Sequence, residues 1–319
     1  MSDNSTATVP PSGVRGLKTI RIGTRDSELA LWQAHTVERK LNDLGYKTEV
    51  IATKSTGDII LDKPLYEFGI TGIFTKTLDV AMITGQIDIA VHSMKDVPTA
   101  LPIGVAQAAV LERESPNDIL VYNGEIDFTH VNTIATGSLR RQAQWLNRFP
   151  HHETVDLRGN VNTRLKKLKE NNWNGAIFAE AGLDRINLKP EFYLDLNWMI
   201  PAPAQGAMLV VVMANDDFCK EAVAKLNHKE SDICTHIERQ FLKTLEGGCT
   251  APIGALATVI DNQIRFEGAL FSLDGKEKIH VEKAISITDY KNFGEECARE
   301  ILANGGDVVM EKIKSDLEK

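Results

Sequence analysis

The sequence predicts an α/β protein made of doubly wound domains and a small C-terminal α+β domain. Its 319 residues are 43% hydrophobic and 25% charged, an ordinary globular balance that favours two or three domains. The short apolar runs 87–91 and 175–179 are typical of strands buried on both faces of a parallel sheet. Strand-like and helical patterns alternate around these runs, whereas three strands and then two helices close the chain.

The composition argues against several classes of protein. Residues 1–17 are polar and carry Pro10, Pro11 and Gly13, so we expect a disordered tail and not a secretory signal. No apolar run approaches the roughly 18 residues that span a bilayer. The net charge of −8 argues against nucleic-acid binding. The four cysteines are widely spaced, which predicts neither a disulfide framework nor a metal site and fits a reducing, cytoplasmic location.

The first strand, 19–24, runs into a helix that we expect over about 28–44. Asp26 or Ser27 would cap this helix. Free backbone N–H groups at its start, beside Arg25, form a plausible anion site, although a plain strand–helix junction with a surface arginine explains the pattern as well. The next elements are a strand at 48–52 and a helix at 74–83, which carries Lys76.

The buried strand 87–91 ends in a polar turn that contains Lys95 and Asp96. Ligands of open α/β sheets gather at the carboxyl ends of strands, so this pair is a candidate site. A surface ion pair of little energetic value is the alternative.

Residues 116–200 read as a second α/β unit with a concentration of positive charge. After a strand at 133–136, Ser138 opens a helix whose first turn contains Arg140 and Arg141. Two arginines in that place oppose the helix dipole, and a bound anion would explain them.

The positive charge continues beyond this helix. From 139 to 167 the chain has seven Arg or Lys against two Asp or Glu. A solvated helix face is the usual meaning of such a run. However, Arg140, Arg141, Arg158 and Arg164 fall near predicted strand ends and helix starts, and arginine suits bidentate binding of carboxylate or phosphate, so we favour a binding role.

A stretch rich in proline and glycine, 201–207, precedes the strand 208–213 and would let the chain cross back to the first domain through a hinge. The helix 233–245 then leads into the bend that holds Cys249. The remaining elements are strands near 255–259, 263–271 and 278–285 and helices near 292–303 and 308–317.

Cys249 stands between two glycines and Pro252. The glycines permit positive φ and close approach of another group, and the proline limits how the chain continues. The thiol is therefore a candidate nucleophile or attachment point on a loop. A small buried apolar residue in a structural turn is the alternative.

The sequence contains no P-loop, no G-x-G-x-x-G, no H-E-x-x-H and no G-x-S-x-G motif. The arginines instead predict a polyanionic ligand. An aspartate among arginines, such as Asp96, stays ionised and can stabilise a cation that develops in a transition state.

Five motifs stand in order along the chain: IGTRDSELALWQA at 22–34, VHSMKDVP at 91–98, SLRRQ at 138–142, LRGNVNTRL at 157–165 and LEGGC at 245–249. Together they resemble the porphobilinogen deaminase family, also called hydroxymethylbilane synthases. The resemblance runs from about residue 18 to the C-terminus.

The resemblance implies a transferase of porphyrin and heme biosynthesis. Such an enzyme joins four porphobilinogen molecules head to tail, releases ammonia each time and frees the linear tetrapyrrole hydroxymethylbilane. It carries a dipyrromethane primer, bound by a thioether to the cysteine that matches Cys249. Asp96 matches the catalytic aspartate, which contacts pyrrole N–H groups and stabilises the cation formed as the amine leaves.

The resemblance also implies residues that bind the acetate and propionate groups, and it implies no metal. The cofactor-binding positions match Lys76, Lys95, Ser138, Arg140, Arg141, Arg158 and Arg164. The substrate-binding positions match Arg25, Ser27, Arg185 and Gln205.

The resemblance implies two domains of the type II periplasmic binding-protein fold and a small α+β domain whose cofactor loop reaches into their cleft. We expect a monomer whose partner is the small molecule porphobilinogen, with no nucleic acid and no membrane. The expected division is a tail at 1–17, a first domain at 18–114 and 205–225, a second at 115–204 and a third at 226–319.

The sequence departs from the family pattern at four positions. Thr71 stands where lysine is usual, and Gly137 replaces a serine, so each removes a possible cofactor contact. Glu180 stands where a small or apolar residue is common, and Ala204 replaces a glycine and would stiffen the crossing. None of these changes touches Asp96 or Cys249, so we expect an active enzyme.

Two rival hypotheses remain at this point. One is a non-enzymatic binding protein for an anionic small molecule, because a fold does not fix a function. The other is a thiol enzyme that uses Cys249 as a nucleophile in every turnover, which requires an activating base nearby.

Overall fold

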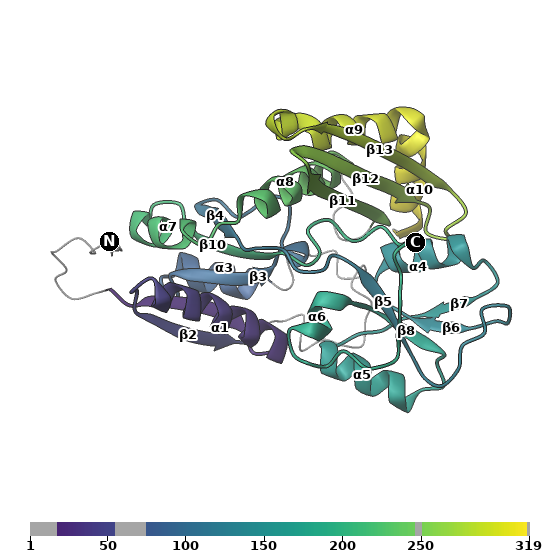
Figure 1. Ribbon diagram of the computed structural model, residues 1–319, viewed down its shortest axis with the longest axis horizontal. Coiled ribbons are helices and arrows are strands. Elements are labelled where there is room, and N and C mark those ends of the chain that lie inside the picture. Colours follow the sequence, from purple (N-terminus) through teal and green to yellow (C-terminus); the bar gives the residue numbers. More distant parts are fainter. Residues whose placement is uncertain (1–17, 55–74, 246–250, 318–319) are drawn as a thin grey trace, which may run out of the picture.

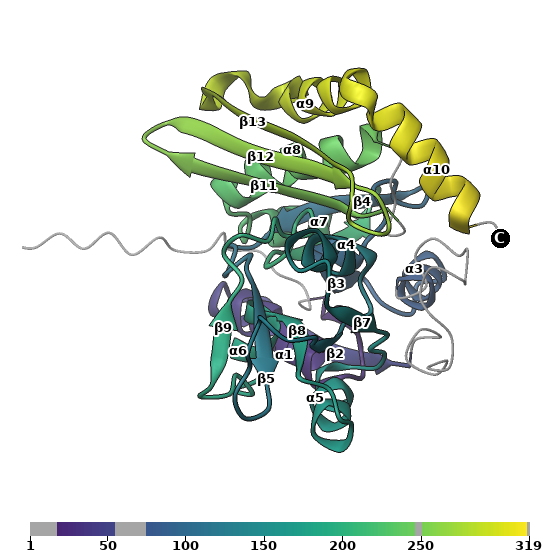
Figure 2. The same cartoon turned by 90° about the vertical axis from the view of Figure 1, so that its right-hand side faces the viewer.

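The computed structural model describes residues 18–54, 75–245 and 251–317. Three sheets organise these residues: two five-stranded sheets lie side by side, and a three-stranded sheet lies across them (Figures 1 and 2). Cys249 and Thr71 lie outside the described residues. Within the described part of the chain, no helix is long and apolar enough to cross a membrane.

The first sheet has the strand order β2-β1-β3-β10-β4. Strands β1 (Ile20–Arg25), β2 (Thr48–Thr53) and β3 (Ile89–Ser93) are parallel, while β10 (Met208–Met213) runs antiparallel to β3 and to β4 (Val105–Val110). The apolar side chains of α1 (Glu28–Asp43) and α7 (Asp217–Ala224) join one core cluster of this sheet, and those of α3 (Lys76–Ile83) join another. Helices therefore bury both faces, which explains the apolar strands.

The second sheet repeats this arrangement in the order β7-β6-β8-β5-β9. Strands β6 (Thr133–Ala135), β7 (Glu153–Val155) and β8 (Gly175–Ala179) are parallel, and β5 (Asp118–Tyr122) runs antiparallel to β8 and β9 (Tyr193–Asp195). Its helices are α4 (Leu139–Arg148), α5 (Val161–Glu170) and α6 (Glu180–Asp184).

The third sheet is an antiparallel meander of β11 (Ile253–Ile260), β12 (Gln263–Phe271) and β13 (Lys278–Ser286). It shares one apolar core with α8 (Lys229–Thr244), α9 (Phe293–Ile301) and α10 (Asp307–Leu317). A smaller cluster of Ala143, Ile200, Ala269 and Phe271 joins β12 to α4 of the second sheet. The predicted two α/β units and α+β unit are therefore confirmed.

The predicted elements agree with the structure within a few residues, as is usual for element ends. Ser27, and not Asp26, caps α1, because its side chain accepts the N–H of Ala30. Helix α8 begins at Lys229, earlier than predicted. The sequence pattern did not predict β4, β5, β7, β9, α5, α6 and α7, most of which are short or lack a clear apolar period.

Candidate active site

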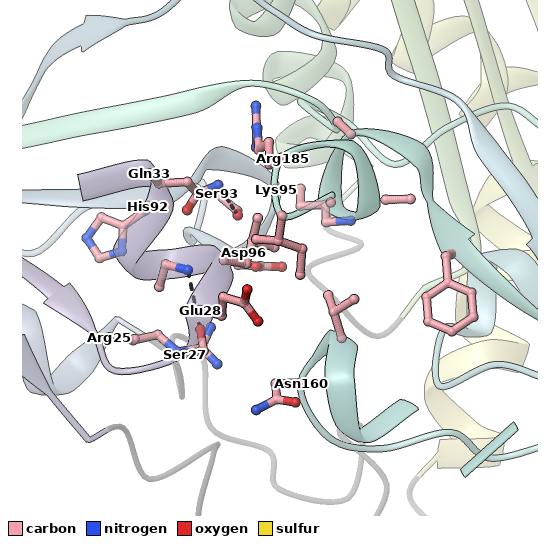
Figure 3. A pocket seen from close by; sticks show the side chains of 18 of the residues that line it. Arg25, Ser27, Glu28, Gln33, His92, Ser93, Lys95, Asp96, Asn160 and Arg185 are labelled. Carbon is pink, nitrogen blue, oxygen red and sulfur yellow. Dashed lines mark hydrogen bonds between the residues drawn. The ribbon is translucent and has the colours of Figure 1, made fainter. Parts of the chain in front are cut away.

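A cleft opens between the first two sheets. One wall comes from the start of α1 and from the end of β3, with Arg25, Ser27, Ser93, Lys95 and Asp96. The opposite wall comes from α4, the start of α5 and α6, with Arg141, Arg158, Asn160, Arg164 and Arg185. Figure 3 shows Asp96 near the middle of the labelled side chains, with Asn160 across the cleft from Ser27.

The first wall follows from sheet topology. Strands β1 and β3 are parallel neighbours, so their carboxyl ends meet at one edge. Arg25 is the last residue of β1, and a single turn of 3₁₀ helix, η2 (Met94–Asp96), follows β3. Residues 25 and 96 thus lie in one cleft although they are distant in sequence.

Lys95 and Asp96 project into the cleft from this turn. Burial, followed by the positive charge of Arg141, lowers the pKa of Lys95 from 10.5 to about 8. The Lys95 ammonium donates to Oε1 of Gln205 at 3.0 Å. His92, which also lines the cleft, has its pKa lowered to about 4 by burial and by Arg25, so its imidazole is neutral at pH 7.

The second wall concentrates guanidinium groups. Burial and the charge of Arg141 lower the pKa of Arg164 to about 10, whereas the carboxylate of Asp96 acts in the opposite direction. The Nε of Arg164 donates to the carbonyl of Gly159 at 2.7 Å. Asn160 caps α5 by accepting the N–H of Thr163, which sets the direction of the helix that carries Arg164. Asp96 therefore faces a wall of cations.

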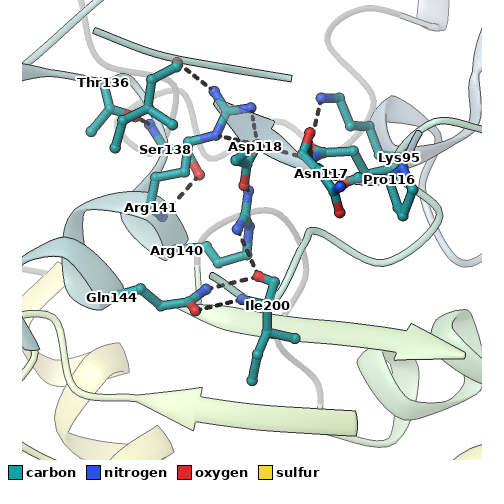
Figure 4. Close-up of polar contacts among 12 residues, drawn as sticks. Lys95, Pro116, Asn117, Asp118, Thr136, Ser138, Arg140, Arg141, Gln144 and Ile200 are labelled. Atoms are coloured by element: carbon teal, nitrogen blue, oxygen red, sulfur yellow. Dashed lines mark hydrogen bonds and ion pairs between the residues drawn. The ribbon is translucent and has the colours of Figure 1, made fainter. Parts of the chain in front are cut away.

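Asp118 lies behind this wall and holds Arg141 of the wall together with its neighbour Arg140 (Figure 4). Its carboxylate accepts from Nη2 of Arg140 at 2.7 Å and from Nε and Nη2 of Arg141 at 3.0 and 2.7 Å. Burial alone would raise the pKa of Asp118, but the charges of Arg140 and Arg141 outweigh it and hold the pKa below its ordinary value. The anion that the two arginines required is thus a carboxylate of the protein itself.

Gln205 extends the Asp118 network to the first wall. Its Nε2 donates to Asp118 at 2.8 Å and to the carbonyl of Pro116 at 2.7 Å, while its Oε1 accepts from Lys95. Both crossings between the first two sheets, near residues 116 and 205, meet at this side chain. Gln205 therefore links the cations of the two walls.

Arg185 lies at the back of the cleft. Its Nε donates to Glu114 at 2.9 Å and its Nη2 donates to the carbonyl of Gly206 at 2.8 Å. The guanidinium also lies over the ring of Trp32, 5.6 Å from the centroid. Arg185 is thus held by both crossings and by α1.

Most of the predicted site residues come together, but some do not line the cleft. Arg25, Ser27, Lys95, Asp96, Arg141, Arg158, Arg164 and Arg185 line it. Arg140 and Gln205 lie behind it, in the Asp118 network, and Ser138 caps α4 by accepting the N–H of Arg141. Lys76 is exposed at the start of α3.

Sequence reasoning missed several residues that organise the site. Asp118 follows no motif, and only the unexplained arginine pair indicated that an anion was needed. Arg113, Glu238 and Arg239 were also missed, because each connects segments that are remote in sequence.

Three of the four departures from the family pattern lie among the described residues, and the structure shows what surrounds each of them. A Cβ on Gly137 would lie 2.6 Å from the carbonyl oxygen of Leu157, so the neighbouring backbone leaves no room for a side chain. Ala204 has φ of 63°, in the left-handed region that favours glycine. Glu180 accepts from Ser115 at 2.5 Å and pairs with Lys189, so it fastens a crossing to α6.

Comparison with known proteins decides the family. A family model described as "Porphobilinogen deaminase, dipyromethane cofactor binding domain" matches residues 20–221, and the model of the C-terminal domain of that family matches residues 233–303. The chain belongs to the porphobilinogen deaminase family. The resemblance found in the motifs is thereby confirmed.

The curated relatives have nearly the same length. Porphobilinogen deaminase from Pelobacter propionicus is 40% identical over 303 residues, which are 93% of this chain and 97% of that one. The enzyme from Syntrophomonas wolfei is also 40% identical over 303 residues, covering 92% and 98%. Among solved structures, a probable amino-acid ABC transporter extracellular-binding protein from Bacillus subtilis aligns over 66% of this chain and 90% of that chain, with 14% identity and a TM-score of 0.42.

Membership in the porphobilinogen deaminase family confirms the main predictions. The chain is a transferase of tetrapyrrole biosynthesis that condenses porphobilinogen to hydroxymethylbilane, and its cofactor is dipyrromethane. Two five-stranded α/β sheets precede the part of the chain that matches the C-terminal domain of the family. The hypothesis of a non-enzymatic binding protein is wrong.

The residues of the cleft suit the cofactor. Dipyrromethane carries acetate and propionate groups on both rings. Within the described part of the chain, six cationic side chains line the cleft against the carboxylates of Glu28 and Asp96. The lowered pKa values of Lys95 and Arg164 reflect buried charges surrounded by other cations, which carboxylate groups would neutralise.

Proposed function

We propose that Asp96 is the catalytic group and that the surrounding cations hold the carboxylates of the cofactor and the substrate. The observation that carries this proposal is the placement of the Asp96 carboxylate beside Lys95 on one wall of the cleft, facing the arginines of the other wall. In this place a carboxylate can accept hydrogen bonds from pyrrole N–H groups. It also stabilises the positive charge that develops on porphobilinogen when ammonia leaves.

The cations divide between the cofactor and the substrate. Lys95, Arg141, Arg158 and Arg164 are proposed to bind the acetate and propionate groups of the cofactor, while Arg25, Ser27 and Arg185 bind those of the substrate. When bound, dipyrromethane supplies the pyrrole carbon to which the first substrate unit is joined. Arg140, Ser138 and Gln205 act through their neighbours, because they contact Asp118 and the backbone behind the cleft. Lys76 remains a proposed cofactor residue at the start of α3.

The remaining predictions belong to the same proposal. Cys249 would carry the primer by a thioether, which makes the thiol a permanent tether and not a nucleophile of each turnover. The domain division at 18–114 with 205–225, 115–204 and 226–319 is supported by the membership of β10 in the first sheet. A cytoplasmic monomer fits an enzyme whose substrate is a small molecule.

Replacement of Asp96 by Asn tests the catalytic role. We expect Asp96→Asn to fold and to keep its primer but to lose turnover of porphobilinogen by about 100-fold or more, because the charge opposite the developing cation is lost. Steady-state kinetics measure the loss. The matched control is Asp43→Asn at the exposed end of α1, which should keep normal kinetics. Near-normal turnover of Asp96→Asn would refute the role.

Intact-protein mass tests the tether. The purified chain from a heme-making host should exceed the mass of the bare polypeptide by one dipyrromethane, and Cys249→Ala should show the bare mass. A bare mass for the unmodified sequence would contradict the tether, and an added mass on Cys249→Ala would point to another anchor.

A further inference from the structure

The turn that carries Lys95 and Asp96 is fixed from two directions. Met94 and Val97, at its two ends, are 1% and 4% exposed in the core, while Lys95 and Asp96 between them line the cleft. The N–H of Met94 donates to the carbonyl of Ala207 in the return crossing at 3.0 Å. This bond fixes the start of the turn.

The end of the turn is held by Arg239, a residue of the third domain. Its Nη1 donates to the carbonyl of Val97 at 2.9 Å and, at 3.3 Å, to that of Met94. Its Nη2 donates to the carbonyl of Pro98 at 2.5 Å. One guanidinium therefore bridges three carbonyl groups of a segment that is remote in sequence, which a planar fork of donors does better than a single ammonium.

Helix α8, which carries Arg239, is itself anchored. Its neighbour Glu238 is fully buried, pairs with Arg113 at 2.6 Å and accepts the backbone N–H groups of Ala204 and Ala257 at 2.6 and 2.8 Å. Figure 1 shows α8 between the β3-β10-β4 sheet and the three-stranded sheet. Arg239 thus connects the turn to a helix that is itself held in place.

We propose that Arg239 is a positioning residue for the reaction: it holds the backbone of residues 94–98 so that Asp96 meets the reacting pyrrole in the productive geometry. Arg239 is not among the described residues that line the cleft. The proposal rests on the proposed role of Asp96. A displacement of about 1 Å at a catalytic group can lower a rate by about 100-fold. Arg239 can therefore affect the rate through the position of Asp96, without contacting the substrate.

The experiment compares Arg239→Met and Arg239→Lys in the primer-loaded enzyme. Met keeps most of the volume and loses every donor, so kcat should fall by about 10- to 100-fold while KM for porphobilinogen changes by less than about threefold. Lys can reach one carbonyl and should recover part of kcat. Arg299→Met is the control and should keep normal kinetics, because Arg299 is an exposed arginine of α9 that pairs with Glu295 of the same helix.

Intact mass and thermal melting separate positioning from simple stability. A variant that keeps its primer, melts cooperatively and loses kcat supports the proposal. A variant that melts earlier but has the parental kcat per folded, primer-loaded molecule overturns it, as does a rise in KM alone. If Arg239→Met does not fold, Arg239→Lys decides by the same criteria. If Asp96→Asn is active, the catalytic proposal fails independently of these results.

Discussion

At the scale of single residues, Asp118 explains why an acidic chain concentrates arginines in its second domain. Its one carboxylate holds two buried guanidinium groups and the amide of Gln205. A buried pair of like charges is costly unless a counter-charge accompanies it. One carboxylate against two guanidinium groups leaves a positive excess, so the network still attracts the carboxylates of a ligand at the Arg141 edge of the cleft.

The buried ammonium of Lys95 should make the stability of the folded chain depend on pH. Because its pKa falls from 10.5 to about 8 in the folded chain, the buried ammonium destabilises the folded state below about pH 8, and this cost fades as the pH rises toward 10.5. In a primer-free Cys249→Ala background, Lys95→Met should therefore be more stable than its parent at pH 7, and the advantage should shrink by pH 10. Urea unfolding at several pH values measures the difference.

The control for this test is Lys76→Met in the same background, since Lys76 is exposed. Replacement of this exposed side chain should change the free energy of unfolding by less than about 0.5 kcal/mol. An advantage of Lys95→Met that stays constant or grows between pH 7 and 10 would contradict the buried charge.

At the scale of elements, the two crossings between the first two sheets decide how the walls of the cleft face each other. Gly206 has φ of 85°, and a Cβ there would lie 2.5 Å from the carbonyl oxygen of Glu114 and 2.7 Å from that of Ser115. The two crossings therefore touch backbone to backbone at this glycine. Ala204, two residues earlier, also has positive φ.

Gly206→Ala should separate the crossings. Two costs add: about 1–3 kcal/mol for an alanine at positive φ, and about 1–3 kcal/mol for the overpacked contact. Gly104→Ala is the matched control, because Gly104 has φ of 87° but its nearest neighbour to a Cβ is Cε of Met213 at 3.5 Å. Urea unfolding of both variants gives the free-energy cost of the overpacked contact, because the cost of positive φ is common to both. Equal losses of stability would show that the crossings tolerate a methyl group.

At the scale of the whole molecule, the three domains meet at Glu238. Its carboxylate is fully buried and pairs with Arg113, which lies just after β4 of the first sheet. The same carboxylate accepts the backbone N–H groups of Ala204 in the crossing and of Ala257 in β11. Arg113 also donates to the carbonyl of Gln205 at 2.8 Å, next to the Asp118 network. This polar junction thus holds the third domain against the residues that lie behind the cleft.

Arg113→Met should weaken this junction. Removing one partner leaves the buried carboxylate of Glu238 without its counter-charge, so we expect a loss of about 3–5 kcal/mol in the free energy of unfolding. Urea denaturation measures it, and Glu238→Gln in the Arg113→Met background should recover part of the loss. Arg299→Met, on the exposed face of α9, should change stability by less than about 0.5 kcal/mol. A similar small change for Arg113→Met would mean that the junction contributes little.

The sequence by itself determined what depends on local pattern. Apolar runs such as 175–179 predicted the buried strands, Ser138 predicted the start of α4, and the arginines predicted a polyanionic ligand. The ordered motifs, including the turn with Lys95 and Asp96, were enough to predict the family that the comparisons then confirmed.

Only the tertiary structure decided which of these groups reach the cleft. Arg140 and Arg141 are adjacent in sequence, yet Arg141 lines the cleft and Arg140 lies behind it, because successive residues of a helix point in different directions. Asp118 and Arg239 have no local signal, since their partners lie on other elements that are distant in sequence. Long-range contacts settle such roles, because a buried charge is tolerated only where the fold brings its counter-charge or its carbonyl groups.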